Sequence, residues 1–116
     1  MITITIQKIK EVYDIRLKGH ANYQPGNDIV CAAVSALTFA LAQKAVDMDA
    51  EEKGHIIERQ IEPGDTRIAF LPGKTAEEEW KIALSTIVEG YNLIQAVHPS
   101  NVVVDNRVGE IKKERC

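Results

Sequence analysis

The sequence predicts an α+β fold in which a mostly antiparallel sheet is packed by two helices. Three observations support this prediction. Short stretches alternate between apolar and polar residues, which is typical of half-buried strands. Two longer stretches are apolar at helical spacing. Turn residues between these stretches give the element order β-β-α-β-β-α-β. A length of 116 residues predicts a single domain spanning 1–116.

The first two strands are expected close to the N-terminus. In the first, alternate isoleucines face one side, and these are Ile2, Ile4 and Ile6. In the second, over residues 12–18, apolar side chains point inward and charged side chains outward. The inward set is Tyr13, Ile15 and Leu17, and the outward set is Asp14, Arg16 and Lys18.

The first helix is expected from residue 28 to about residue 47, where the chain is rich in alanine. Its main apolar stripe consists of Val30, Ala33, Val34, Leu37 and Leu41. Because it is apolar on most faces, we expect it to be buried between other elements or in a dimer. Asn27 or Asp28 is expected to cap its start. The acidic residues 47–52 predict a solvated connection after it.

The second half of the chain predicts a hairpin, a helix and a last strand. Strands over 55–61 and 65–71 flank a turn rich in proline and glycine. Thr75, followed by Glu78, resembles a capping box. The helix that follows has apolar side chains at a period of 3.6 residues. Residues 102–104 predict the last strand.

Composition disfavours several classes of partner. The net charge of −3 gives no general attraction to nucleic acid or anionic lipid. No continuous apolar run reaches the roughly 18 residues that a membrane helix needs. The N-terminal residues alternate as a strand does and do not resemble a signal peptide. Two cysteines do not make a disulfide scaffold, which favours a reducing cytoplasmic location.

The segment 19–37 contains the residues with chemical potential. His20 follows the second strand, and Cys31 lies in the opening turn of the first helix. If Asp28 caps this helix, Cys31 is its third residue. The first-turn N–H groups then favour a thiolate, and they could donate to an oxyanion during acyl transfer. His20 could accept the thiol proton.

Other residues of the segment could support this pair. Ser35 follows Cys31 by four residues and therefore shares its helix face. Asp28 could cap the helix or orient His20 as a third member of a triad. Gly19 and Gly26 bracket the loop and could act as hinges. Tyr23 could pack against a bound side chain or against the protein itself.

The same residues also allow structural roles without chemistry. A cysteine in an alanine-rich helix is usually part of the core. Asp28 could be a cap alone, and Ser35 a small packing residue. A metal site formed by His20, Asp28 and Cys31 is disfavoured because no second Cys/His pair occurs at ligand spacing. We therefore expect no metal and no organic cofactor.

Residues 19–21 (Gly-His-Ala) and 26–37 (Gly-Asn-Asp-Ile-Val-Cys-Ala-Ala-Val-Ser-Ala-Leu) resemble the signature of the ribosomal-processing cysteine protease family, Prp. The whole chain is similar to that family in length and element order. The resemblance implies a small homodimeric cytoplasmic endopeptidase of bacteria such as Firmicutes. The substrate that it implies is the precursor of ribosomal protein bL27, from which a short N-terminal extension is removed.

The resemblance also implies roles for single residues. Cys31 matches the nucleophile and His20 the general base of a Cys/His dyad. Asp28 and Ser35 match the supporting polar positions, and Gly19 and Gly26 match the loop glycines. One departure is visible, because the family pattern has one more residue between His20 and Cys31 than the ten present here. The missing residue falls within 23–26, where it could change the reach of His20 or the side chains accepted.

Two alternatives remain open from the sequence. The same chemistry could act on a phage capsid or scaffold protein, since Prp-like proteins are also associated with phages. The chain could instead be a non-catalytic dimeric module that docks peptides or senses redox state. Native-state reactivity of Cys31 separates a buried core cysteine from an accessible nucleophile.

Overall fold

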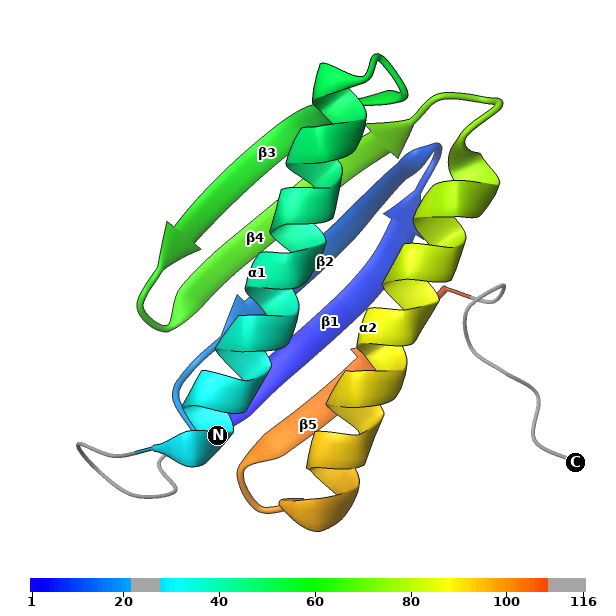
Figure 1. Cartoon of the computed structure of the whole chain (residues 1–116). Helices are drawn as coiled ribbons and strands as arrows, with labels where there is room; N and C mark the ends of the chain where they lie inside the picture. Colours follow the sequence, from blue (N-terminus) through cyan, green and yellow to red (C-terminus); the bar gives the residue numbers. More distant parts are fainter. Residues whose placement is uncertain (22–27, 109–116) are drawn as a thin grey trace, which may run out of the picture.

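Five strands form one sheet in the order β3-β4-β2-β1-β5, and both helices cover the same face of it (Figure 1). This computed structural model describes residues 1–21 and 28–108. Among the described strands, β1 and β5 pair in parallel and the other neighbours are antiparallel. The elements are β1 (Ile2–Ile9), β2 (Val12–Lys18), α1 (Ile29–Ala50), β3 (Gly54–Glu62), β4 (Asp65–Pro72), α2 (Glu77–Val97) and β5 (Val102–Asn106). The predicted α+β fold and element order are confirmed.

The central strands β1 and β2 bury their apolar side chains against the helices as predicted. Ile4, Ile6 and Ile15 are completely buried. Asp14 was predicted to face solvent, but only 6% of it is exposed. The Arg67 guanidinium on β4 donates to both of its carboxylate oxygens, at 3.1 and 3.3 Å. This bidentate ion pair satisfies the carboxylate and takes the place of water around it.

Helix α1 packs one face on the sheet and leaves another face open. It continues to Ala50, so residues 47–50 are helical and the predicted acidic connection is shorter than expected. We call the exposed residues Ala32, Ala36, Phe39 and Ala40 the outer face of α1. By length and composition alone α1 could cross a membrane, with a mean hydropathy of 1.8 over 18 residues. The core helix of a soluble protein passes the same test, and Gln43 and Lys44 interrupt the apolar run of α1, so this helix is not a continuous apolar run of about 18 residues.

Helix α2 supplies the centre of the core. Trp80 is fully buried, with its ring 4.5 Å from that of Phe70 and 6.4 Å from that of Tyr13 between centroids. The predicted capping box was wrong, because Ala76 precedes the helix and no side chain caps it. The first turn instead carries three glutamates, which the helix dipole favours at this end. One of these glutamates, Glu77, accepts hydrogen bonds from Lys8 on β1 and Tyr13 on β2, which hold the start of α2 against the sheet.

Candidate active site

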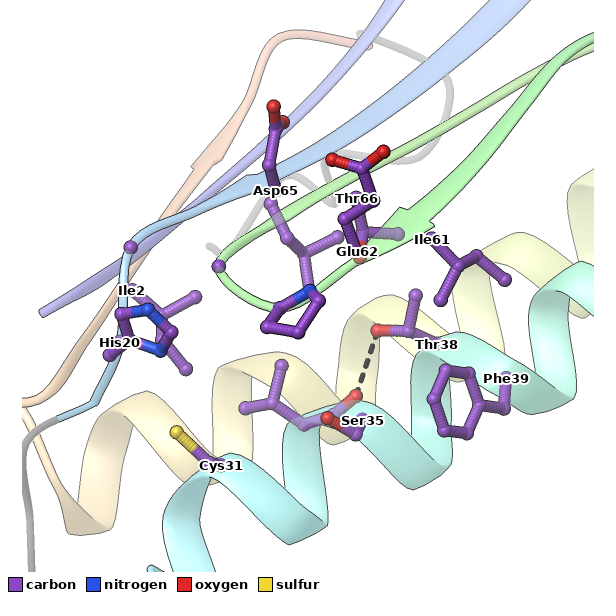
Figure 2. Close-up of a pocket in the computed structure, with 15 residues that line it drawn as sticks. Ile2, His20, Cys31, Ser35, Thr38, Phe39, Ile61, Glu62, Asp65 and Thr66 are labelled. Carbon is purple, nitrogen blue, oxygen red and sulfur yellow. Dashed lines mark hydrogen bonds between the residues drawn. The ribbon is translucent and has the colours of Figure 1, made fainter. Parts of the chain in front are cut away.

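A pocket of about 350 Å³ lies between α1, the end of β2 and the β3–β4 turn (Figure 2). The N-terminal part of the chain contributes Ile2, Leu17, Gly19 and His20. Helix α1 contributes Cys31, Val34, Ser35, Thr38 and Phe39, and the hairpin contributes Ile61, Glu62, Pro63, Gly64, Asp65 and Thr66. The pocket therefore gathers Cys31, His20 and Ser35, which the sequence had singled out.

Cys31 is the third residue of α1, as the sequence predicts, and its thiol is directed toward the pocket (Figure 2). It is a free cysteine and is partly exposed. Its Sγ accepts a hydrogen bond from the backbone N–H of Ala21 at 3.3 Å. An N–H donor at this distance stabilises a sulfur anion more than a neutral thiol. Cys31 is thus both accessible and supplied with a donor.

Asp28 is the N-cap of α1. Its Oδ1 accepts the N–H groups of Val30 and Cys31, each at 3.0 Å. The N–H of Ala32 donates to the Asp28 carbonyl at 3.1 Å. These are the first-turn groups that were expected to hold an oxyanion, so that expectation needs correction because they already have acceptors. The capping role of Asp28 is confirmed, and its orienting role toward His20 stays a prediction.

His20 is exposed and lies against the turn between β3 and β4. The N–H of Gly19 donates to the Gly64 carbonyl at 2.9 Å, which ties the two segments together. A Cβ atom placed on Gly64 would lie 2.6 Å from His20 Nε2. Gly64 also has a φ of +74°, which disfavours other residues. The turn therefore provides the surface against which the imidazole rests.

His20 and Cys31 lie at the same end of the pocket (Figure 2). In the part of the chain that the structure describes, no hydrogen bond joins their side chains. Apo active sites often show such loose geometry and tighten only when substrate binds. The sequence had marked residues 62–65 only as a turn, and no local signal indicates that Gly64 contacts His20.

Ser35 lines the pocket one helical turn beyond Cys31, as its spacing predicts. Farther along α1, the Thr38 hydroxyl donates to the Val34 carbonyl at 2.8 Å. Its oxygen lies 2.6 Å from Tyr91 Oη on α2, so the tyrosine donates in this contact. Burial raises the pKa of Tyr91 to about 12, which keeps the phenol protonated. This link fixes the far wall of the pocket to the second helix.

Two of the predicted site residues, Tyr23 and Gly26, lie outside the described residues. So does the shortened segment 23–26, whose effect on the reach of His20 stays a prediction. Within residues 1–21 and 28–108, no group of three His, Cys, Asp or Glu side chains is placed to hold a metal ion.

The chain is similar in sequence to one protein family and in fold to several solved structures. A model of the family described as cysteine protease Prp matches residues 1–103. The fold is similar to that of the ribosomal processing protease Prp from S. aureus in complex with a covalently linked product peptide (TM-score 0.71, 23% identity). A complex of the S. aureus protease with a substrate peptide gives a TM-score of 0.68 at 22% identity. Both alignments cover 92% of this chain and 100% of the other.

A third similar structure is that of SMU.848 from Streptococcus mutans, with a TM-score of 0.67 and 23% identity. That alignment covers 93% of this chain and 95% of the other. No curated protein sequence matched. At these identities the structural likeness concerns the fold, whereas the family model covers most of the chain.

Proposed function

The chain belongs to the cysteine protease Prp family, and we propose that it removes the short N-terminal extension of ribosomal protein bL27. Membership makes the chain a cysteine-type peptidase. The observation that carries the proposal is the position of Cys31. It lies in the first turn of α1 and lines the pocket at the same end as His20. Further support comes from the similar S. aureus protein, which is described as a ribosomal processing protease and was crystallised with a substrate peptide.

In the proposed reaction, His20 takes the proton from the Cys31 thiol and the thiolate attacks the scissile carbonyl carbon. A carbon–sulfur bond forms, and the carbonyl electron pair moves to oxygen. The tetrahedral intermediate then collapses, the carbon–nitrogen bond breaks, and His20 returns the proton to the leaving amine. Water then hydrolyses the thioester and regenerates the thiol. No metal or organic cofactor takes part in these steps.

The test is incubation of the purified protein with bL27 precursor, followed by measurement of the product masses. We expect one cut that releases the extension, and we expect Cys31→Ala and His20→Ala to prevent it. Each variant should keep a thermal midpoint close to that of the wild-type protein. A shift of about 1 °C corresponds to about 0.2 kcal/mol of lost stability. Loss of cleavage only in variants that have unfolded would contradict the proposed dyad.

The other outcomes identify the alternatives. No cut of bL27, together with rapid native-state alkylation of Cys31, would direct the search to phage capsid or scaffold proteins. No cut and a thiol that alkylates only after unfolding would favour a non-catalytic module. Because the chain contains a second cysteine, these measurements use a Cys116→Ser background.

We also propose that the enzyme is a cytoplasmic homodimer. The outer face of α1 supports this proposal, because it presents Phe39 and three alanines to solvent. Exposed apolar patches of this kind often mark protein interfaces. A cytoplasmic location follows from the proposed substrate, since ribosomal proteins are assembled there.

A further inference from the structure

We propose that Asn101 is a positioning residue of the catalytic centre, which holds the Ala21 backbone so that its N–H points at Cys31 Sγ. This inference rests on the proposed role of Cys31 as the nucleophile. It extends the site to a side chain 80 positions away from Ala21 in the sequence.

Both polar backbone groups of Ala21 have partners that bear on the site. The N–H donates to Cys31 Sγ at 3.3 Å, and the carbonyl accepts from Asn101 Nδ2 at 2.9 Å. Only 1% of Ala21 is exposed, so little water can replace either partner. The orientation of the Asn101 amide follows from this contact, because a carbonyl oxygen requires a donor. Asn101 therefore fixes the residue that carries the donor.

Asn101 is itself held firmly between α2 and β5. Its carbonyl accepts the N–H of Ile2 at 2.8 Å, and its own N–H donates to the His98 carbonyl at 3.0 Å. The next residue begins β5, which pairs with β1 from Ile2 onward. The side chain is thus mounted on backbone that the sheet and the end of α2 both restrain. Precise placement of a functional group requires this kind of support.

The N–H of Ala21 matters because the neighbouring donors are already used. Asp28 Oδ1 engages the N–H groups of Val30 and Cys31. Among the described residues, the Ala21 N–H is the donor that the structure places on the sulfur. A hydrogen bond from this N–H orients the sulfur and stabilises the negative charge that it carries when it attacks a substrate. Loss of the alignment of this N–H therefore weakens the support of the nucleophile.

The test compares Asn101→Ala and Asn101→Asp with a matched control, Gln95→Ala. Gln95 also joins α2 to β5 through one amide–backbone hydrogen bond, which it accepts from the N–H of Val104. It does not line the pocket. All variants carry Cys116→Ser, and each is assayed for peptide cleavage, thermal midpoint and alkylation of Cys31 by iodoacetamide. Alkylation is measured at pH 7 and at pH 9.5, where thiols in general are largely ionised.

Asn101→Ala should lower kcat and the alkylation rate at pH 7 by about tenfold. This is the effect expected when the hydrogen bond from the Ala21 N–H to the charged sulfur is lost. KM and the alkylation rate at pH 9.5 should stay within about twofold, because binding and access of the reagent are unchanged. Asn101→Asp, which keeps the size but replaces the donor by oxygen, should behave in the same way. Gln95→Ala should lose similar stability without either kinetic effect.

Wild-type alkylation at pH 7 in Asn101→Ala would overturn the inference, as would equal losses in Gln95→Ala. A fall at both pH values would also overturn it, because the change would then be one of access. Failure of the proposed function gives a different result. If the wild-type protein cleaves no precursor but Asn101→Ala still slows alkylation at pH 7 alone, the positioning role stands without the protease substrate.

Discussion

Asp28 caps helix α1, although in a catalytic triad a carboxylate at this position would be expected to orient the general base His20. Its Oδ1 accepts two N–H groups at the start of α1, one of them from Cys31 itself. A side-chain cap of this kind stabilises a helix by about 1 kcal/mol. Asp28 therefore fixes the backbone that carries the nucleophile, whatever else its second oxygen contacts.

Substitution of Asp28 separates capping from orientation of His20. Asparagine caps helices about as well as aspartate, so Asp28→Asn should keep kcat within about twofold. Asp28→Ala should lower the free energy of unfolding by about 1 kcal/mol and reduce activity with it. Urea unfolding and steady-state cleavage provide the two measurements. If Asp28→Asn loses activity at wild-type stability, the carboxylate charge acts on His20.

Gly64 lies directly against the imidazole ring of His20. Asparagine tolerates positive φ, so Gly64→Asn keeps the turn while placing a Cβ where the His20 ring now lies. Displacement of the imidazole should lower kcat by about 10- to 100-fold. Single-turnover cleavage measures this loss. Gly73→Asn, at a glycine that lies outside the pocket and lacks the positive φ of Gly64, is the control for adding a side chain to a loop.

A double substitution shows whether Gly64 acts through His20. In a His20→Ala background, Gly64→Asn should cause no further loss of residual cleavage, because the group it displaces is absent. A second loss of similar size would mean instead that the turn contacts the substrate directly.

At the scale of elements, a cluster of three side chains fastens the start of α2 to the β1–β2 hairpin. Glu77 accepts hydrogen bonds from Lys8 Nζ at 2.9 Å and from Tyr13 Oη at 2.8 Å. These bonds, that from Lys8 above all, hold the pKa of Glu77 below its ordinary value. Burial and the bond to Glu77 raise the pKa of Tyr13 to about 12. The cluster therefore attaches the first turn of α2 to the sheet, although no side chain caps this helix.

This cluster predicts a pH-dependent stability. Because the pKa of Glu77 is lower in the folded than in the unfolded protein, its contribution is present above the ordinary value of 4.5 and is lost as the pH falls through the folded value. Glu77→Gln should therefore cost about 0.5 to 1 kcal/mol at pH 7, and the difference should vanish near pH 3. Urea unfolding between pH 7 and pH 3 measures it.

Glu78→Gln is the control for that series, because Glu78 lies in the same turn with its side chain 78% exposed. It should show little dependence on pH. A Glu77→Gln difference that stays constant across the range would rule out the proposed role of ionisation.

At the scale of the whole molecule, α1 has an apolar outer face that no described element covers. If this face joins two copies, Ala36→Glu should convert the dimer to a monomer, because it places an unpaired carboxylate in the interface. Light scattering coupled to size exclusion measures the mass. The control is Thr86→Glu, which introduces the same carboxylate at an exposed position on α2. A monomeric wild-type protein would refute the dimer.

Features that depend on neighbouring residues could be predicted from the sequence, whereas contacts between distant segments could not. The alternation of residues 12–18 predicted β2 with its correct ends, and the position of Cys31 in α1 followed from its distance to Asp28. The burial of Asp14 did not follow, because it depends on Arg67, 53 positions away in the sequence. The contact between Gly64 and His20 and that between Asn101 and Ala21 depend in the same way on how distant segments are placed.

The parallel pairing of β1 with β5 also has a consequence for the order in which the enzyme matures during translation. His20 and Cys31 leave the ribosome long before Asn101 and the strand that completes the sheet beside β1. Until β5 docks, Ala21 lacks the amide that holds its carbonyl, and the sulfur lacks an aligned donor. A nascent chain therefore carries the nucleophile without its support. If Asn101 positions Ala21 as proposed, full reactivity of Cys31 therefore requires that β5 has already docked beside β1.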